Sequence, residues 1–464
     1  MLRGFLFLLF VSMIVSEIRA REAIRPATDV EQVIKDLEDL HVDTIIERGP
    51  PCTLDVQKDL PRPNQVQPLY LRPHTSEYWL PNGKGQLQIP RGASIELHCT
   101  KSFANVSATA NTDEDEDDSD EDAPLLLQVA HNTRSISARC LHDRTFEWVG
   151  GKHELRHFVC KKALRYSVER LQQQCGEEAG GQAHLYRVGY NISDQRFITT
   201  MEICHDASQL RTHYTHHRLV PASVHFQRQV KRTEFSQAGH FTGYNMHTLY
   251  SQRHQMEEAA QLLGASSNPG NVGGLFDVPR GLFLSRGHLA AKADLIYASQ
   301  QRSTFNYLNV APQWQIFNGG QWLAVEDETR KFVARGGLNV SVYTGTWGVM
   351  SMPGSEGSGF FLARDANNNG VLPVPLLFYR VLIDSVHPWR GIALVGVNNP
   401  FATQAQFEAE YVICEPVQEL VAWLRWLQNR NLSKGYLYAC TVADLARAVA
   451  HLPAQLSEVH ELLV

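Results

Sequence analysis

Eight cysteines constrain the fold of this chain more than any other feature of its sequence. Their number is even and no two of them form a Cys-x-x-Cys pair, so disulfides are a better interpretation than a zinc site. The eight are Cys52, Cys99, Cys140, Cys160, Cys175, Cys204, Cys414 and Cys440. We expect four bridges, in which the first four cysteines pair among themselves, Cys175 pairs with Cys204, and Cys414 pairs with Cys440.

The N-terminus predicts export from the cell. Residues 1–4 are basic, residues 5–15 form an apolar run too short to span a bilayer, and small residues lead up to Ala20. We interpret residues 1–20 as a signal peptide and the mature protein as secreted, with no membrane partner. Four sequons fit a glycosylated extracellular surface, and they begin at Asn105, Asn191, Asn339 and Asn431.

The length of 464 residues and the distribution of turn residues predict two folded units. Residues 21–46 are polar and are interpreted as a linker or pro-segment. Between residues 47 and 167, short apolar runs alternate with Gly, Pro and Cys, which is typical of a small β-rich module. Residues 168–464 follow an α+β pattern and are expected to form the second unit.

The net charge of −6 hides a mildly basic protein. Nine of the 49 acidic residues lie within residues 113–122, and without them the 43 basic residues outnumber the acids by three. Such a balance permits binding to a polyanion without demanding it. We interpret residues 111–123 as a disordered, solvated loop inside the β-rich module. The alternative is an autoinhibitory mimic of nucleic acid.

The second unit shows recognisable strands and helices. Tyr244–Leu263 is polar and helix-prone. Glu419–Asn429 is predicted to be an amphipathic helix, in which Trp423 and Trp426 are core residues. Strands are expected at His184–Tyr190, Arg196–Cys204, Leu376–Ile383 and Ile392–Val397. We predict that Asp365–Gly370 is a turn rather than a calcium loop, and that His213, His216 and His217 belong to a loop rather than a metal site.

The chemistry is concentrated between residues 285 and 330. The apolar segment Leu282–Leu284 is expected to be a strand that delivers Arg286 and His288 on the same side, because side chains alternate along a strand. Gly287 between them allows a close backbone approach. An arginine and a histidine so placed, followed by an amide and a carboxylate, suit phosphodiester cleavage with one divalent metal.

Asn318–Lys331 is predicted to be a helix that carries the metal ligands. In a regular helix Glu326 lies roughly 80° around the axis and about 12 Å along it from Asn318. Both residues share one side of the helix but cannot both bind one metal directly. We therefore assign Asn318 as the direct ligand and Glu326 as a ligand through water, with Arg330 one turn further on the same side.

These motifs resemble those of the DNA/RNA non-specific endonucleases. Ser285-Arg286-Gly287-His288 is similar to the family's Asp-Arg-Gly-His, and Asn309-Val310-Ala311-Pro312-Gln313 to its Asn-x-x-Pro-Gln. Asn318, Trp322 and Glu326 complete the pattern. The amino-acid sequence around Ser285 resembles that of the secreted arthropod branch, which includes double-stranded RNases. The likeness covers roughly residues 170–440, and the N-terminal module also resembles the extra domain of that branch.

The resemblance implies a ββα-metal (His-Me finger) nuclease domain with a central antiparallel sheet. It implies Mg²⁺, with Mn²⁺ as a substitute, and substrates that are DNA and RNA, single- or double-stranded, with double-stranded RNA as a candidate preference. His288 would be the general base, and Arg286 and Arg330 would hold the phosphate or the leaving group. Arg232 would be a further substrate-binding arginine, and Asn309 would fix the loop of the metal site. A homodimer is one of the oligomeric states that the sequence allows.

One motif position departs from the family. Ser285 replaces the aspartate, which removes a carboxylate that could orient its neighbours. The arthropod branch tolerates this change, and all the other principal residues are present. We therefore expect an active endonuclease. The alternative is a secreted nucleic-acid-binding protein on a nuclease scaffold with little or no turnover, which would bind without cleavage.

Overall fold

The computed structural model describes most of the chain. The described ranges are 49–62, 65–104, 106–107, 126–127, 133–176, 182–265, 272–428 and 434–464. The predicted signal peptide, the linker up to residue 46 and the acidic loop 111–123 lie outside these ranges, as do the sequons at Asn105 and Asn431. No helix of the described part is long and apolar enough to cross a bilayer.

Four disulfides form in the expected pattern. Cys52 pairs with Cys140 and Cys99 with Cys160, so the first four cysteines pair among themselves. Cys175–Cys204 and Cys414–Cys440 are the other two bridges. Each of the four joins residues within one predicted unit, so none of them ties the N-terminal module to the rest of the chain.

The N-terminal module is β-rich, as predicted. Strand β1 (Cys52–Asp55) pairs with β3 (Gln86–Ile89), and β5 (Val106–Ser107) pairs with β6 (Leu126–Leu127). A five-stranded antiparallel sheet follows the order β2 (Leu69–Leu71), β4 (Ser94–His98), β7 (Ser135–His142), β8 (Thr145–Trp148) and β9 (Gly151–Glu154). In β7 the side chains alternate between exposed and buried, which is the pattern of a half-solvated sheet.

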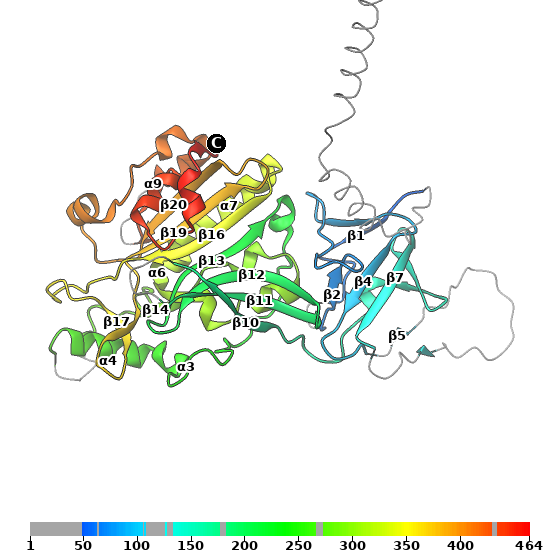
Figure 1. Cartoon of the computed structure of the whole chain (residues 1–464), viewed down its shortest axis with the longest axis horizontal. Coiled ribbons are helices and arrows are strands. Elements are labelled where there is room, and N and C mark those ends of the chain that lie inside the picture. The colour runs from blue at the N-terminus through cyan, green and yellow to red at the C-terminus, as the bar shows by residue number, and fades with distance from the viewer. Residues whose placement is uncertain are drawn as a thin grey trace, which may run out of the picture.

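A larger antiparallel sheet forms the centre of the second unit (Figure 1). Its strands, in spatial order, are β10 (Ser167–Gln174), β11 (His184–Ser193), β12 (Arg196–Asp206), β13 (Arg211–Leu219), β16 (Val340–Trp347), β19 (Leu377–Asp384), β20 (Arg390–Val397) and β21 (Leu437–Cys440). A short strand, β22 (Glu461–Leu462), pairs parallel to β20. The four strands predicted from the sequence are thus confirmed within a few residues.

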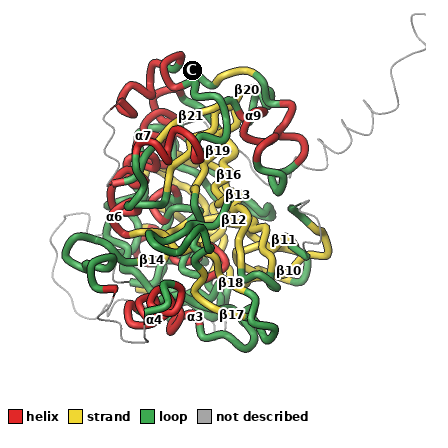
Figure 2. Tube along the Cα trace, turned by 90° about the vertical axis from the view of Figure 1, so that its left-hand side faces the viewer, coloured by secondary structure: helices red, strands yellow, loops and turns green. Residues whose placement is uncertain are grey.

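The central sheet is covered on both faces. Every residue of β19 is buried, which explains its nearly continuous apolar sequence. One face packs on the larger hydrophobic core, which includes the elements that carry the sequence motifs. The other face packs on a second core that includes α9 (Val442–Ala448). Figure 2 shows the strands between α7 and α9, seen from the side.

A ββα unit lies over the first of these faces. Strand β14 (Leu284–His288) pairs with β15 (Val310–Trp314), and α6 (Gln315–Phe317), a π-helical turn (Asn318–Trp322) and α7 (Leu323–Gly336) follow. Buried Asn398 accepts a hydrogen bond from the Trp314 N–H (2.9 Å) and donates to the Pro312 and Pro375 carbonyls, which ties the hairpin to the sheet. Gly337, with φ 63°, ends α7.

Two helix predictions need correction. Tyr244–Leu263 is not one helix, because Ser251 caps a new one and separates α3 (Met246–Leu249) from α4 (Gln252–Leu262). In place of the helix predicted at 419–429, of which residue 429 lies outside the described residues, the chain forms 3-10 turns at Gln418–Leu420 and Ala422–Gln428. The buried residues of this segment are Val421, Leu424 and Leu427. A spacing of three matches the three residues per turn of a 3-10 helix.

Other connecting elements are short. They are η1 (Leu155–His157), η2 (Pro221–His225), η4 (Lys292–Asp294), α5 (Ala298–Ser303), η5 (Tyr307–Asn309), β17 (Phe361–Arg364), β18 (Gly370–Pro373), α8 (Gln404–Gln406), η7 (Phe407–Tyr411) and η11 (Ala454–Glu458). Asp365–Gly370 is a turn between β17 and β18, as predicted. The three histidines of residues 213–217 lie in β13, however, and not in a loop.

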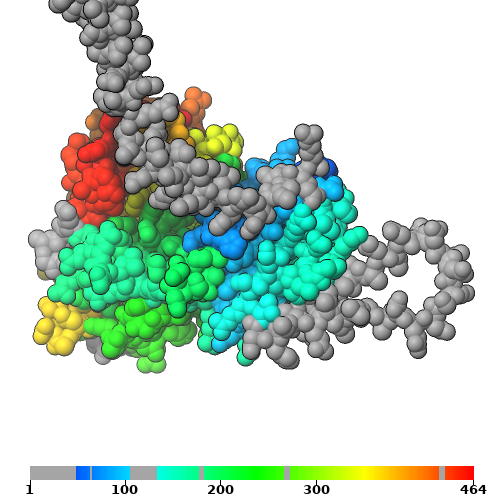
Figure 3. Space-filling view, turned by 45° about the vertical axis from the view of Figure 1, so that its right-hand side comes forward, coloured from blue at the N-terminus to red at the C-terminus, as the bar shows by residue number. Residues whose placement is uncertain are grey.

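The N-terminal module and the second unit share one hydrophobic core. Tyr297, immediately before α5, lies 5.1 Å from the Tyr70 ring and 5.7 Å from the Tyr78 ring, measured between centroids. Ile198 and Tyr190 of the central sheet belong to the same core. The module, blue to cyan, lies directly against the green segments in Figure 3. The predicted boundary at residue 167 therefore separates sequence segments that pack as one body.

Candidate active site

Strand β14 presents Arg286 and His288 on one side, as expected from the alternation of strand side chains. The Phe235 ring contacts both residues, at 5.3 Å from the His288 ring and 5.6 Å from the Arg286 guanidinium. The strand begins at Leu284 and includes the motif, whereas the sequence placed it at 282–284. Gly287 faces the other way, where a Cβ atom would lie 2.3 Å from Gln313 Oε1.

Arg286 is held by aromatic side chains. Its Nε donates to the Tyr307 hydroxyl at 3.1 Å, and its guanidinium lies 5.4 Å from the Tyr250 ring. Among the described residues it makes no ion pair with a carboxylate. Its positive charge therefore stays available to an anionic ligand, while the rings limit its orientation.

His288 is a neutral imidazole in this environment. Burial, reinforced by the charges of Arg232 and Lys292, lowers the pKa of His288 to about 3. Its Nε2 is enclosed and has no hydrogen-bond partner in the described chain, whereas Nδ1 is not enclosed. A neutral ring with one accessible nitrogen can accept a proton.

Ser285 orients the amide of Asn318. The Ser285 hydroxyl donates to the Gln313 carbonyl at 2.9 Å and accepts from Asn318 Nδ2 at 2.9 Å. The amide nitrogen of Asn318 is thus committed, and Oδ1 accepts no hydrogen bond from the described residues. Serine at the motif aspartate position therefore still supplies an acceptor for this side chain.

The helix that carries Asn318 is not regular at its start. Asn318 lies in the π-helical turn, and Gly320 has non-helical angles of φ −107° and ψ −110°. The estimate of 80° and 12 Å between Asn318 and Glu326 assumed a regular helix and does not apply across this kink. Buried Trp322 anchors the turn beside Phe317, with 5.6 Å between the ring centroids. Such π turns occur frequently at functional sites.

Glu326 is a partly buried carboxyl group without a direct partner in the described chain. Burial, together with the negative charge of Asp294, raises its pKa to about 7, against the opposing charges of Arg330 and Arg380. Asn318 Oδ1 and the Glu326 carboxylate are hard oxygen donors, which suit Mg²⁺ that keeps most of its waters. No group of three or more His, Cys, Asp or Glu that could hold a metal occurs among the described residues.

Arg330 is more enclosed than its predicted role suggests. Its side chain is only 4% exposed, and its Nη1 forms an ion pair with Asp294 Oδ1 at 2.9 Å. Arg232, by contrast, is exposed and makes no described ion pair, yet its charge acts on both His288 and Glu326. Arg232 therefore lies at the open side of the site and Arg330 at its floor.

Asn309 fixes the chain that follows His288. Its amide nitrogen donates to the Ala290 and Thr304 carbonyls at 3.0 and 3.1 Å, and its Oδ1 accepts from the Ala290 N–H at 2.9 Å. The side chain of Asn306 accepts a hydrogen bond from the Asn309 N–H at 3.0 Å. Both asparagines are fully buried and shape the loop without facing the site.

Three buried residues beneath the site were missed by sequence reasoning. Asp294 contacts His217 and Arg380 as well as Arg330. The signal for Arg380 was present, because a charged residue interrupts the apolar run of β19 and must have a buried partner. Asp294 carried no comparable signal. Its partners Arg330, His217 and Arg380 lie 36, 77 and 86 positions away, and the sequence does not indicate that they meet.

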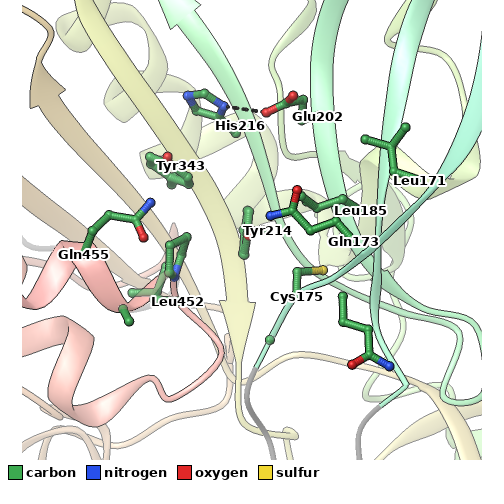
Figure 4. Close-up of a pocket in the computed structure, with 14 residues that line it drawn as sticks. Leu171, Gln173, Cys175, Leu185, Glu202, Tyr214, His216, Tyr343, Leu452 and Gln455 are labelled. Carbon is green, nitrogen blue, oxygen red and sulfur yellow. Dashed lines mark hydrogen bonds and ion pairs between the residues drawn. The ribbon is translucent and has the colours of Figure 1, made fainter.

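Two sizeable cavities lie on the other face of the sheet and belong to a different region. One, of about 630 Å³, is lined by His216, Glu202 and Tyr343 (Figure 4), and the other, of about 900 Å³, by Ser341 and Trp389. His216 bridges Glu202 Oε2 (3.2 Å) and Ser341 Oγ (3.1 Å), which imitates a Ser-His-Glu triad. Ser341 lies within the paired ladder of β16, however, so its backbone N–H cannot serve as an oxyanion hole.

The ββα unit, with a histidine at the end of its first strand and an amide and a carboxylate on its helix, defines the class of ββα-metal nucleases. The chain belongs to the DNA/RNA non-specific endonuclease family, whose model matches residues 181–445. This range agrees with the extent of the resemblance in the sequence. The fold class predicted from the sequence is thereby confirmed.

Curated relatives of the chain include proteins that are named as salivary. The chain is 27% identical to "Salivary endonuclease" of Lutzomyia longipalpis over 53% of its length and 56% of the relative's. It is 21% identical to "Salivary protein Tsal2A" and 23% identical to "Salivary protein Tsal1" of Glossina morsitans morsitans. These alignments cover 65% and 71% of this chain, and 72% and 78% of the relatives.

A comparison with solved structures finds EndoG in its complex with the inhibitor EndoGI. The likeness covers 55% of this chain and 82% of that one at 18% identity. Its TM-score is 0.28, which is too low to support an argument about this chain.

Proposed function

We propose that this chain is a secreted, metal-dependent endonuclease that hydrolyses phosphodiester bonds of DNA and RNA. The observation that carries the proposal is the arrangement of three groups: a neutral His288, an Arg286 that has no carboxylate partner among the described residues, and an Asn318 whose Oδ1 accepts no hydrogen bond from them. These groups supply a base, a phosphate-binding cation and a metal ligand. Family membership and the salivary relatives support the same reaction.

The proposed reaction begins with proton transfer to His288. Its accessible Nδ1 accepts a proton from water, whose oxygen attacks phosphorus while the bond to the leaving oxygen breaks and that oxygen takes up a proton. The low pKa of His288 reflects burial and two nearby cations. The bound phosphate is negative, and its charge opposes those cations and makes the imidazole more basic.

The remaining residues bind the phosphate and the metal ion. Arg286 and Arg232 contact the phosphate oxygens, and Arg330 acts from the floor of the site. Asn318 would hold Mg²⁺ directly and Glu326 through water, and Mn²⁺ can substitute. The ion would neutralise the phosphate and stabilise the charge that develops in the transition state.

Substrate range and setting are part of the proposal. The resemblance to the arthropod branch favours double-stranded RNA among the substrates. The predicted signal peptide, the four disulfides and the salivary relatives support secretion. The alternative, a nucleic-acid-binding protein with little turnover, retains one supporting observation, which is the enclosure of Arg330.

Cleavage of plasmid DNA and of long double-stranded RNA tests the proposal. The full secreted protein should cut both with Mg²⁺ and neither with EDTA, and His288→Ala should lose about 10²–10⁴-fold in rate. The ratio of the two rates ranks the substrates. Salt-sensitive binding without metal-dependent cutting would instead establish the binding protein.

A further inference from the structure

We propose that Asp294 is a positioning residue of this active site, which holds Arg330 and helix α7 in place against the sheet. The inference rests on the proposed function and extends it to a residue outside the motifs. Asp294 lies in η4, six residues after His288, so the chain that leaves the candidate base leads directly to it.

The carboxylate of Asp294 joins three elements. Its Oδ1 accepts from Arg330 Nη1 of α7 at 2.9 Å. Its Oδ2 contacts Arg380 Nη2 of β19 at 2.7 Å and His217 Nε2 of β13 at 2.8 Å. One side chain therefore fixes the helix of Glu326 and Arg330 relative to two central strands of the sheet.

The cluster is enclosed within the protein. The side chains of Asp294, His217 and Arg380 have no exposed surface, and that of Arg330 is 4% exposed. Arg380 is held from its other side by Thr344 Oγ1 at 3.2 Å. Burial alone would raise the pKa of Asp294, but Arg380, His217 and Arg330 hold it well below its usual value, so the carboxylate stays charged.

Stability alone is a poor explanation for this arrangement. A buried ion-pair cluster often stabilises a fold no more than well-packed apolar side chains of similar volume. Apolar side chains could not, however, fix the plane of a guanidinium group. Arg330 Nη1 donates to the buried Asp294, whereas the other carboxylate with which Arg330 forms a described ion pair, that of Asp327, lies 3.5 Å from Nη2 and is half exposed. Asp294 therefore dominates the orientation of Arg330.

Asp294→Asn is the direct test, because it keeps the shape of the side chain and removes its charge. In the cleavage assay on plasmid DNA with Mg²⁺ we expect kcat to fall about 10–100-fold and KM to change less than about 3-fold. Asp384→Asn is the matched control. It also removes the charge of a nearly buried carboxylate, which pairs with His387 and Arg390 at the end of β19. It should lower thermal stability and leave kcat unchanged.

A double variant separates positioning from general destabilisation. If Asp294 acts through Arg330, Asp294→Asn combined with Arg330→Ala should be no slower than Arg330→Ala alone. Independent, multiplying effects would overturn the proposal, as would a folded Asp294→Asn with wild-type kcat. If Asp294→Asn does not fold, Arg330→Lys decides, since it keeps the charge without the planar fork. Wild-type kcat in Arg330→Lys would mean that orientation is not needed.

Failure of this proposal is distinguishable from failure of the proposed function. If the wild-type protein does not cut, or if His288→Ala cuts as fast as the wild-type protein, both the proposed endonuclease function and the role of Asp294 are wrong. A wild-type protein that cuts through His288 while Asp294→Asn cuts equally fast defeats only the role of Asp294.

Discussion

At the scale of single residues, the hydroxyl of Ser285 does part of the work expected of the motif aspartate. It accepts from Asn318 Nδ2 and donates to a strand carbonyl, so it has a fixed direction. A carboxylate would add a negative charge beside the metal ligand. The serine keeps the orienting hydrogen bond without that charge.

Removing the Ser285 hydroxyl should weaken the binding of the metal ion. We expect Ser285→Ala to lower the cleavage rate about 10–100-fold and to raise the Mg²⁺ concentration needed for half the maximal rate, because Asn318 loses its orienting partner. The measurement is the rate as a function of Mg²⁺ concentration. Ser341→Ala, which removes a strand hydroxyl on the opposite face of the sheet, is the control. An unchanged Mg²⁺ dependence in Ser285→Ala would contradict the role of Ser285.

Buried histidines should make the fold sensitive to acid. Burial lowers the pKa of both His205 and His98 to about 4. The unfolded chain takes up their protons near the ordinary pKa of about 6.5, so the stability they contribute is present above pH 6.5 and falls toward pH 4. At pH 5 each should account for roughly 2 kcal/mol of lost stability.

Urea unfolding at pH 7.5 and pH 5 checks this expectation. The unfolding midpoint of the wild-type protein should drop, and His205→Gln should show a smaller drop between the two pH values. His142→Gln, on the surface, controls for the loss of an imidazole. Equal pH dependence in the wild-type protein and His205→Gln would contradict the assignment.

Residue-level prediction succeeded where the chemistry is local in sequence. Arg286 and His288 share a side because they are two apart on a strand, and the contacts of Phe235 confirm it. The pairs Asn318–Ser285 and Asp294–Arg380 are 33 and 86 residues apart and depend on how the hairpin packs on the sheet. A sequence without long-range information cannot specify them.

At the scale of elements, the β14–β15 hairpin depends on the absence of a side chain at Gly287. A Cβ atom there would lie 2.3 Å from Oε1 and 2.6 Å from Cβ of the buried Gln313. The Gly in one strand and the Gln in the other thus form a complementary pair. Their spacing in the sequence follows from the register, in which Gly287 pairs with Ala311 beside Gln313.

Gly287→Ala should therefore destabilise the fold. We expect a loss of about 1–3 kcal/mol in the free energy of unfolding, because Gln313 and the strand must move to relieve the contact. Gly274→Ala is the matched control, since nothing lies within 4 Å of a Cβ atom built there. Chemical denaturation of both variants measures the difference. Equal stability of the two would mean that the hairpin accommodates the methyl group.

Element prediction failed where periodicity was ambiguous. Four strands of the central sheet were predictable from their apolar residues, whereas β13, which contains three histidines, was predicted as a loop. The segment 419–429 was predicted as an α-helix, although the buried residues of its described part, 419–428, recur every three positions and that part forms 3-10 turns. The π turn at Asn318–Trp322 has no sequence signature beyond its two glycines, and it overrides the regular geometry assumed for the metal ligands.

At the scale of the whole molecule, the N-terminal module is bound to the catalytic unit by more than a covalent connection. Gln227 donates to the Val56 carbonyl at 3.0 Å and also accepts from the Ala298 N–H at 2.8 Å. The Arg196 guanidinium binds both carboxylate oxygens of Glu96. The Gln227 contact reaches the first residue of α5, Ala298, four residues after Asp294.

A chain that starts at residue 168 should not fold as well as the full protein. Without the module, Tyr297 and Ile198 lose the core that covers them, and exposed apolar surface promotes aggregation. We expect the truncated chain to be insoluble or to unfold at a temperature many degrees lower, and the full protein to melt in a single transition. Differential scanning calorimetry tests this. Two separate transitions in the full protein would show independent units.

The shared core also changes how natural variation in this chain is to be interpreted. A substitution at Tyr70 or Tyr78 lies far from His288 in sequence, yet it alters the support of the segment that carries Tyr297. In a saturation screen scored by enzymatic output, such positions would cluster with the catalytic motifs. Phenotype alone would then assign the module a chemical role, whereas its contribution is mechanical support of a neighbouring loop.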